Sequence, residues 1–379
     1  MFLQAPRNQA LTLAASALAL GAAFAAPTFA QATTAEAQYS TFAPSGTPSD
    51  HKIDYSIWDE AMSNLVISMG PSLRESAGSP PQSLGTRRQY GHVSRYRLEG
   101  SRLMFSFLDA EIISSFTEYR EDLQRTADIV DIQSLSRNEQ LAYWINLHNV
   151  AMIEQIALAW PVRQPRDIEI DGVPLDEARF IMVEGVALSP RDIRENIVYA
   201  NWRDPKVIYG FWRGEIGGPS IQREAFNAEN VSRLLERGAR DFVNSLRGTQ
   251  RQGSTLQVSE FFAEAAPFYF PNFESDLRAH LADYADTETT ELLNGTSRID
   301  ASVKEYDIAD LAGGAREPTY QNISSVDGTQ QSFRVPQSMT RLLAQREEKF
   351  ERLVREGRTG TVTFSTFSVD GEEEDNEVE

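Results

Sequence analysis

The helix expected between Ser136 and Ala159 constrains the fold of this chain more than any other segment. Ser136 is a typical N-cap, Glu139 follows three residues later to form a capping box, and Pro161 lies just beyond the helix end. The segment is apolar on nearly every side rather than along one stripe, so we expect it to lie in the middle of a domain. Its large apolar side chains are Leu141, Ile145, Leu147, Met152, Ile156 and Leu158.

The rest of the chain mixes helical and strand-type patterns. Helical spacing runs from Ser101 past Tyr119, and it returns at 228–246 and 336–356. Short apolar runs typical of strands occur at 168–170, 180–183 and 206–209, with a helix expected at 190–199. Because strands and helices do not alternate strictly, we predict an α+β fold. The expected form is a helix-rich single domain with a small mixed or antiparallel sheet.

The two ends of the chain predict export and a charged tail. Arg7 precedes an apolar run from Leu11 to Ala26, and Ala30 follows as a small residue at a cleavage position, so residues 1–30 read as a signal peptide. Residues 31–50 are small and polar and predict a flexible lead-in. We expect the main domain at 51–285, a C-terminal extension packed on it at 286–369, and a disordered acidic tail at 370–379.

Charge and cysteine content exclude several classes of function. The formal net charge is −19, with 55 acidic against 36 basic residues, which speaks against nucleic acid and anionic lipid as partners. The chain holds no cysteine, so a disulfide, a thiolate nucleophile and a cysteine metal ligand are all impossible. We expect a periplasmic or secreted protein without stable membrane insertion once the signal is removed.

Several short motifs resemble the domain-of-unknown-function 547 family. The residues 138–150, reading NEQLAYWINLHNV, are similar to its F-W-I-N-L-Y-N helix, and Trp160-Pro161-Val162 is similar to the helix exit of that family. The segments 186–193, 204–207 and 218–226 resemble later family elements in the same order, so the resemblance covers about 100–285.

The resemblance implies a distant likeness to papain-like or transglutaminase-like hydrolases, but this chain departs from the family at two positions. Ile208 stands where many bacterial members have histidine, and Gly218 stands where they have cysteine. These departures imply a member that has lost thiol chemistry.

Polar residues on the central helix form the first part of a candidate cleft. Asn146 and Asn149 lie within about 60° of each other around a helix, and a buried amide without a partner costs about 1 to 3 kcal/mol. They therefore either hold a neighbouring loop or line a cleft. His148 occupies a position where the family has tyrosine, and Trp144 is counted with the same candidate cleft.

The glycine-rich loop 212–220 forms the second part. Glycines allow close backbone approach, so its N–H groups could bind an anion or an oxyanion, and its charged side chains could orient a polar ligand. The alternative is a tight structural turn. The candidate residues here are Arg213, Glu215, Gly217, Gly218 and Ser220.

Other chemistry receives little support from the sequence. His51, His92 and His280 have no metal-ligand spacing, so we expect no metal site and no cofactor. Carboxylate pairs such as Glu260 with Glu264 could act as acid and base, but acids this frequent form pairs by chance.

The sequence favours a binding or interaction module for an unknown envelope ligand or protein, built on a degenerate hydrolase-like domain. An active amide or peptide hydrolase or acyl transferase is the alternative, with Ser220 or a carboxylate replacing the cysteine. A structural envelope protein is the third possibility.

Overall fold

The computed structural model describes residues 38–45, 49–79, 90–318, 320–324 and 332–358. The chain divides into the units Met1–Thr41 and Phe42–Glu379, and the second unit holds the central helix, the glycine-rich loop and the C-terminal extension. The expected signal peptide, residues 359–369 of the expected C-terminal extension and the acidic tail all lie outside the described residues.

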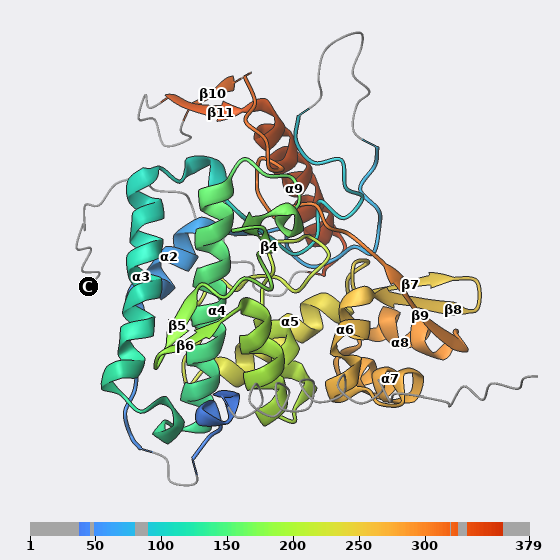
Figure 1. Ribbon diagram of the computed structural model, residues 1–379. Coiled ribbons are helices and arrows are strands. Elements are labelled where there is room, and N and C mark those ends of the chain that lie inside the picture. The colour runs from blue at the N-terminus through green and yellow to red at the C-terminus, as the bar shows by residue number, and fades with distance from the viewer. Residues whose placement is uncertain (1–37, 46–48, 80–89, 319, 325–331, 359–379) are drawn as a thin grey trace, which may run out of the picture. The chain divides into compact units, whose positions relative to one another are not determined.

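More of the described residues lie in helices than in strands, and the strands form small separate sheets, so the fold is α+β as predicted (Figure 1). The α-helices are α2 (Ser56–Leu65), α3 (Ala110–Ile129), α4 (Arg137–Ala159), α5 (Val231–Val243), α6 (Glu260–Tyr269), α7 (Phe273–Tyr284), α8 (Thr287–Asn294) and α9 (Gln337–Arg355). Short 3-10 helices are η2 (Phe105–Phe107), η3 (Ile132–Ser134), η4 (Pro165–Asp167) and η6 (Pro205–Gly210), and η5 (Asp192–Tyr199) is a π-helix.

The strands form two-stranded antiparallel pairs except in one sheet. The two-stranded pairs are β1 (Val66–Ser68) with β2 (Ser101–Leu103), β3 (Glu169–Ile170) with β4 (Val173–Pro174), β5 (Ile181–Val183) with β6 (Val186–Leu188), and β10 (Tyr320–Ser324) with β11 (Ser332–Pro336). The mixed sheet has the order β7 (Thr249–Gln252), β8 (Thr255–Ser259), β9 (Arg298–Val303), with β8 and β9 parallel.

Helix α4 is the centre of the core, which confirms the prediction for residues 136–159. The Ser136 side chain accepts a hydrogen bond from the Glu139 N–H and caps the helix. The Glu139 carboxylate instead accepts from the backbone N–H groups of Ile53 and Ala228, at 3.0 and 3.1 Å, so it ties α4 to two distant segments. The long helices α3 and α4 lie side by side in Figure 1.

Two predictions at element boundaries were wrong. Residues from Ser101 do not begin a helix, because 101–103 pair with β1 and the Asp109 side chain caps α3 by accepting from Ile112. The run 206–209 is part of η6 rather than a strand, since the Asp204 side chain caps it and Pro205 starts its first turn.

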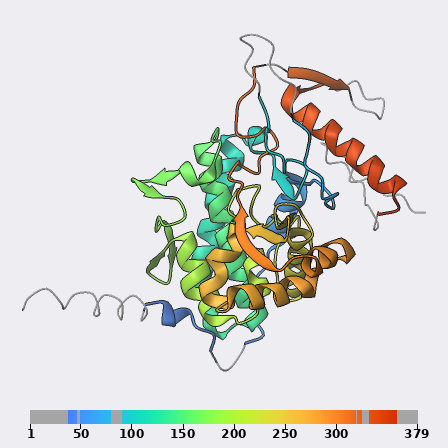
Figure 2. The same cartoon turned by 90° about the vertical axis from the view of Figure 1, so that its right-hand side faces the viewer.

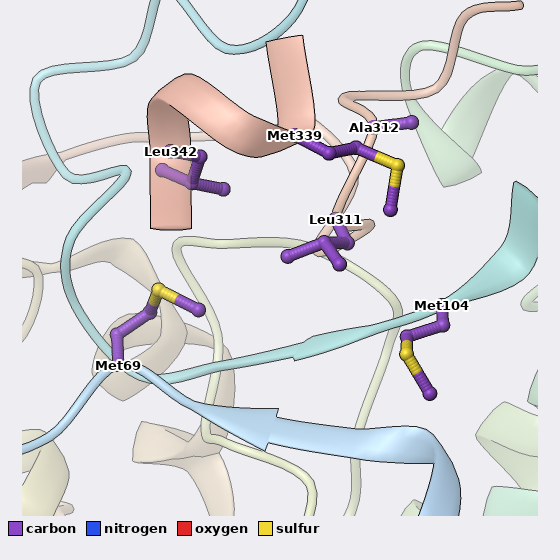
Figure 3. Close-up of a cluster of buried hydrophobic side chains, with 6 residues drawn as sticks. All are labelled: Met69, Met104, Leu311, Ala312, Met339 and Leu342. Carbon is purple, nitrogen blue, oxygen red and sulfur yellow. The ribbon is translucent and has the colours of Figure 1, made fainter. Parts of the chain in front are cut away.

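Helix α9 docks on the domain through a methionine-rich cluster, drawn in Figure 3. The cluster joins Met339 and Leu342 of α9 to Met69, Met104 and Leu311. The Lys349 ammonium group donates to three backbone carbonyls, those of Met69, Gly70 and Leu98. A buried cation is thus held by carbonyl dipoles rather than by a carboxylate.

Candidate functional site

Asn149 on α4 fixes the start of the glycine-rich loop. Its amide oxygen accepts from the Trp212 N–H at 3.0 Å, and its amide NH₂ donates to the Gly210 carbonyl at 2.9 Å. The side chain is 3% exposed, so both backbone groups are satisfied without water. Asn149 therefore fixes the path of the backbone from the end of η6 into the glycine-rich loop. Arg213 is the next residue after this fixed point.

His148 supports Asn149 from the same helix. The imidazole Nδ1 lies 3.0 Å from the Asn149 oxygen, and Nε2 lies 3.1 Å from a guanidinium nitrogen of Arg194 on η5. Since arginine cannot accept, these partners assign the proton to Nδ1. Burial, with the Arg194 charge, lowers the pKa of His148 to about 3. His148 is therefore a neutral hydrogen-bonding group at ordinary pH.

Arg194 continues this network towards the surface. Its guanidinium binds the Asp176 carboxylate through two hydrogen bonds of 2.6 and 2.7 Å. Burial alone would raise the pKa of Asp176, but the Arg194 charge and hydrogen bonds outweigh it and the pKa is lowered. The π-helical turns of η5 place Arg194 so that it links α4 to the segment after β4.

Asn146 and Trp144 are part of the core. The Asn146 amide exchanges two hydrogen bonds with the backbone of Phe226, at 2.7 and 3.1 Å. Trp144 is fully buried between the edges of Phe42 and Tyr143. The two asparagines thus hold two different backbone segments, one at the start of the loop 212–220 and one after its end.

The glycine-rich loop forms one wall of a small pocket of about 20 Å³, enough space for about one water molecule. Arg213, Glu215, Gly217 and Gly218 line this wall. The opposite wall is formed by Ser259 and α6, together with Val303 and Glu305 at the end of β9.

Gly217 and Gly218 have different roles in this pocket. A Cβ atom on Gly217 would lie 2.3 Å from the Glu305 carbonyl oxygen, and the Gly217 N–H donates to that oxygen at 3.1 Å. Glycine is therefore required at 217 by the close approach of the two backbones. A Cβ on Gly218 would meet only the Glu215 carbonyl at 3.8 Å, so position 218 accepts a side chain.

Glu215 lines the pocket with a shifted pKa. Burial raises its pKa, although Arg166 opposes this with two hydrogen bonds of 2.8 and 3.0 Å. The Arg166 guanidinium also lies 3.2 Å from the centre of the Tyr306 ring. Arg166 of η4 thus links Glu215 to Tyr306 of the C-terminal extension.

Arg213 is held at the mouth of the pocket. Its guanidinium forms an ion pair with Glu264 of α6 and lies 5.5 Å from the centre of the Phe261 ring. Burial would lower the pKa of Arg213, but the Glu264 and Asp176 charges outweigh it and the pKa is raised. Arg213 therefore remains a cation in the pocket wall.

Ser220 belongs to a separate ionic network. Its hydroxyl donates to Asp241 at 2.7 Å and accepts from Arg247 at 2.7 Å. Arg247 also donates to the Gly218 carbonyl at 2.6 Å. Among the described residues, Ser220, His148 and Glu215 form no hydrogen bond with one another, because each is engaged by its own partners.

Sequence reasoning missed the opposite wall of the pocket. Ser259 accepts from the Phe261 N–H and so caps α6, which is a helix start signal but says nothing of a site. In the sequence, Glu260 and Glu264 were only one of many carboxylate pairs that an acid-rich chain forms by chance. Within the described ranges, no group of three or more His, Cys, Asp or Glu side chains could hold a metal ion.

The described helices include none with both the length and the apolar character needed to cross a bilayer. No curated protein and no solved structure matches the chain. The family model described as "Protein of unknown function, DUF547" matches residues 132–243. These residues hold α4, η5, η6, the glycine-rich loop and α5. Over residues 132–243, and so over one wall of the pocket, this chain matches the family of proteins of unknown function DUF547.

Proposed function

We propose that this chain is an exported, periplasmic binding protein that receives a polar group of its ligand in the pocket between the glycine-rich loop and α6. The observation that carries the proposal is the convergence of Arg213, Glu215 and the Gly217-Gly218 backbone on one hollow. A few charged groups around a concave site are what a specific polar ligand requires. The signal-like residues 1–30 support export.

Binding is favoured over thiol-type hydrolysis by the residues at the pocket. Gly218 has no side chain to act as nucleophile, and Ile208 is fully buried in the core. The nearby hydroxyl of Ser220 is engaged by Asp241 and Arg247, and Ser220 is not among the residues that line the pocket.

Cysteine labelling can test the pocket, because the chain contains no cysteine. We expect Gly218→Cys to fold and to react with a thiol reagent, since its Cβ would meet only the Glu215 carbonyl oxygen at 3.8 Å and position 218 lines the pocket. Peptidoglycan fragments, peptides and small amines that bind here should slow the labelling. Gly78→Cys is the control, because a Cβ there meets nothing within 4 Å and the exposed Gly78 does not line the pocket. Equal labelling rates with and without every such compound would contradict the proposal.

One observation favours an enzyme as the second candidate. Glu215 lines the pocket with a raised pKa, as a general acid requires, and the Glu260 and Glu264 carboxylates line the same pocket. Under this alternative, Glu215→Gln abolishes turnover of a peptide or amide substrate while the melting temperature stays close to that of the original chain. If turnover is absent in the original chain or unchanged in Glu215→Gln, the carboxylate mechanism fails.

A further inference from the structure

Strand β9 is an edge of the mixed sheet. In the described part of the chain it pairs with β8 and with no other strand. Arg298 and Asp300 are exposed, and β9 faces the viewer in Figure 2 as the orange arrow. An edge strand presents backbone N–H and C=O groups that a further extended chain can pair with.

The edge of β9 leads directly into the pocket. Val303 ends the strand and Glu305 follows two residues later, and both line the pocket. The Glu305 carbonyl is already paired with the Gly217 N–H, and the Asp307 carbonyl accepts from the Ile216 N–H at 2.9 Å. Backbone pairing of the strand type therefore continues from β9 to the glycine-rich loop.

The charges around the pocket favour a cation over an anion. Glu215, Glu260, Glu264 and Glu305 line it, and Arg213 is the one cation among the lining residues. Arg166 and Lys304 reach Glu215 and Glu260 from outside the lining, so four carboxylates face three cations. The Gly217 and Gly218 N–H groups are engaged by backbone carbonyls, so they do not form an open anion site. Glu305 accepts from the Ser94 hydroxyl and from the Asp307 N–H.

Glu260 pairs with two cations, Arg166 at 3.8 Å and Lys304, and the second of them is replaceable. Lys304 contacts Glu260 at 3.2 Å, and its side chain is 57% exposed. Such an exposed pair contributes little to stability, so a ligand ammonium group can take its place. A compact ammonium group suits a hollow of about 20 Å³ better than a planar guanidinium does.

We propose that the ligand is an extended peptide segment that adds to the free edge of β9 and places the ammonium group of a lysine side chain in the carboxylate-lined pocket. This inference rests on the proposed function and names the class of its ligand. Backbone pairing supplies affinity in this mode, and the pocket supplies selection for the basic residue.

The test uses an acetylated heptapeptide of alternating threonine and valine with one lysine at its end, titrated into the mature chain by calorimetry. One arm replaces lysine by norleucine, which keeps the four-carbon chain and removes the ammonium group. A second arm N-methylates alternate residues, which removes the donors on one edge of the peptide. A Glu260→Gln variant tests the pocket, and Glu274→Gln, an exposed acid of α7 outside the pocket, is its control.

We expect the dissociation constant to rise roughly tenfold or more for norleucine, for N-methylation and for Glu260→Gln, and to stay unchanged for Glu274→Gln. Equal affinity after N-methylation would overturn strand addition, and equal affinity with norleucine would overturn lysine selection. If the peptide fails to bind while another compound still protects Gly218→Cys from labelling, the peptide inference is wrong and the binding function stands. If no compound protects that cysteine, the proposed function itself fails.

Discussion

Replacing Asn149 by alanine should destabilise the protein strongly, because three hydrogen bonds end on this one amide. The substitution leaves the Trp212 N–H, the Gly210 carbonyl and the His148 Nδ1–H without their partner. Trp212 and His148 are at most 1% exposed, so water cannot replace the amide without opening the core. At about 1 to 3 kcal/mol for each buried group left unsatisfied, the expected loss is about 4 kcal/mol.

Urea denaturation of the original chain and of Asn149→Ala measures this loss. If the dependence of the unfolding free energy on urea concentration is the same for both, a shift in the midpoint reflects stability. Asn138→Ala is the control on the same helix: Asn138 is exposed and donates one hydrogen bond, to the Ala228 carbonyl at 3.2 Å. It should cost no more than about 1 kcal/mol. If Asn149→Ala costs no more than Asn138→Ala, Asn149 does not hold the glycine-rich loop.

The remaining predictions concern close contacts and buried charges. Gly217→Ala should destabilise by about 1 to 3 kcal/mol because its Cβ would lie 2.3 Å from the Glu305 oxygen, whereas Gly218→Ala should stay within about 0.5 kcal/mol; thermal unfolding compares the two. Burial lowers the pKa of Lys349 to about 8 from 10.5, so the unfolded state binds more protons between these values and stability should rise with pH there. Lys349→Met should remove that rise in a series of melting temperatures. Burial raises the pKa of Asp310 to about 6 from 3.8, so its contribution to stability should fall as pH rises through this window. Asp310→Asn should flatten the fall, and an unchanged pH profile would contradict the burial argument.

The sequence was most informative where local signals and burial agree. The cap at Ser136 and the all-round apolar surface of α4 both come from neighbouring residues, so its bounds were predictable. The start of α3 was not, because residues 101–103 have helical spacing but pair with β1, which lies more than thirty positions earlier. For η6, the Asp204-Pro205 cap was a visible start signal, and the apolar run after it was misread as a strand.

The candidate site was half predictable for the same reason. The glycines and charged residues of one short loop were enough to predict Arg213, Glu215, Gly217 and Gly218 as candidate site residues. These four residues do line one pocket. The opposite wall reaches the pocket through the pairing of β8 with β9, a contact between residues about forty positions apart. Nothing in the sequence distinguishes Glu260 or Glu305 from the many other acids of this chain.

The two walls of the pocket also differ in how far the family match reaches. The glycine-rich loop and the α4 residues that hold it lie within residues 132–243, whereas Ser259, the acids of α6 and Glu305 lie beyond them. A shared scaffold does not by itself carry a shared ligand, because recognition depends on the particular groups that face it. If the ligand is chosen by the carboxylates of the second wall, a relative that shares the loop but has other residues on that wall should bind a different ligand. Replacing Glu260 and Glu264 by other residues should therefore change which peptide binds. Replacing Asn149 should instead change whether the protein folds.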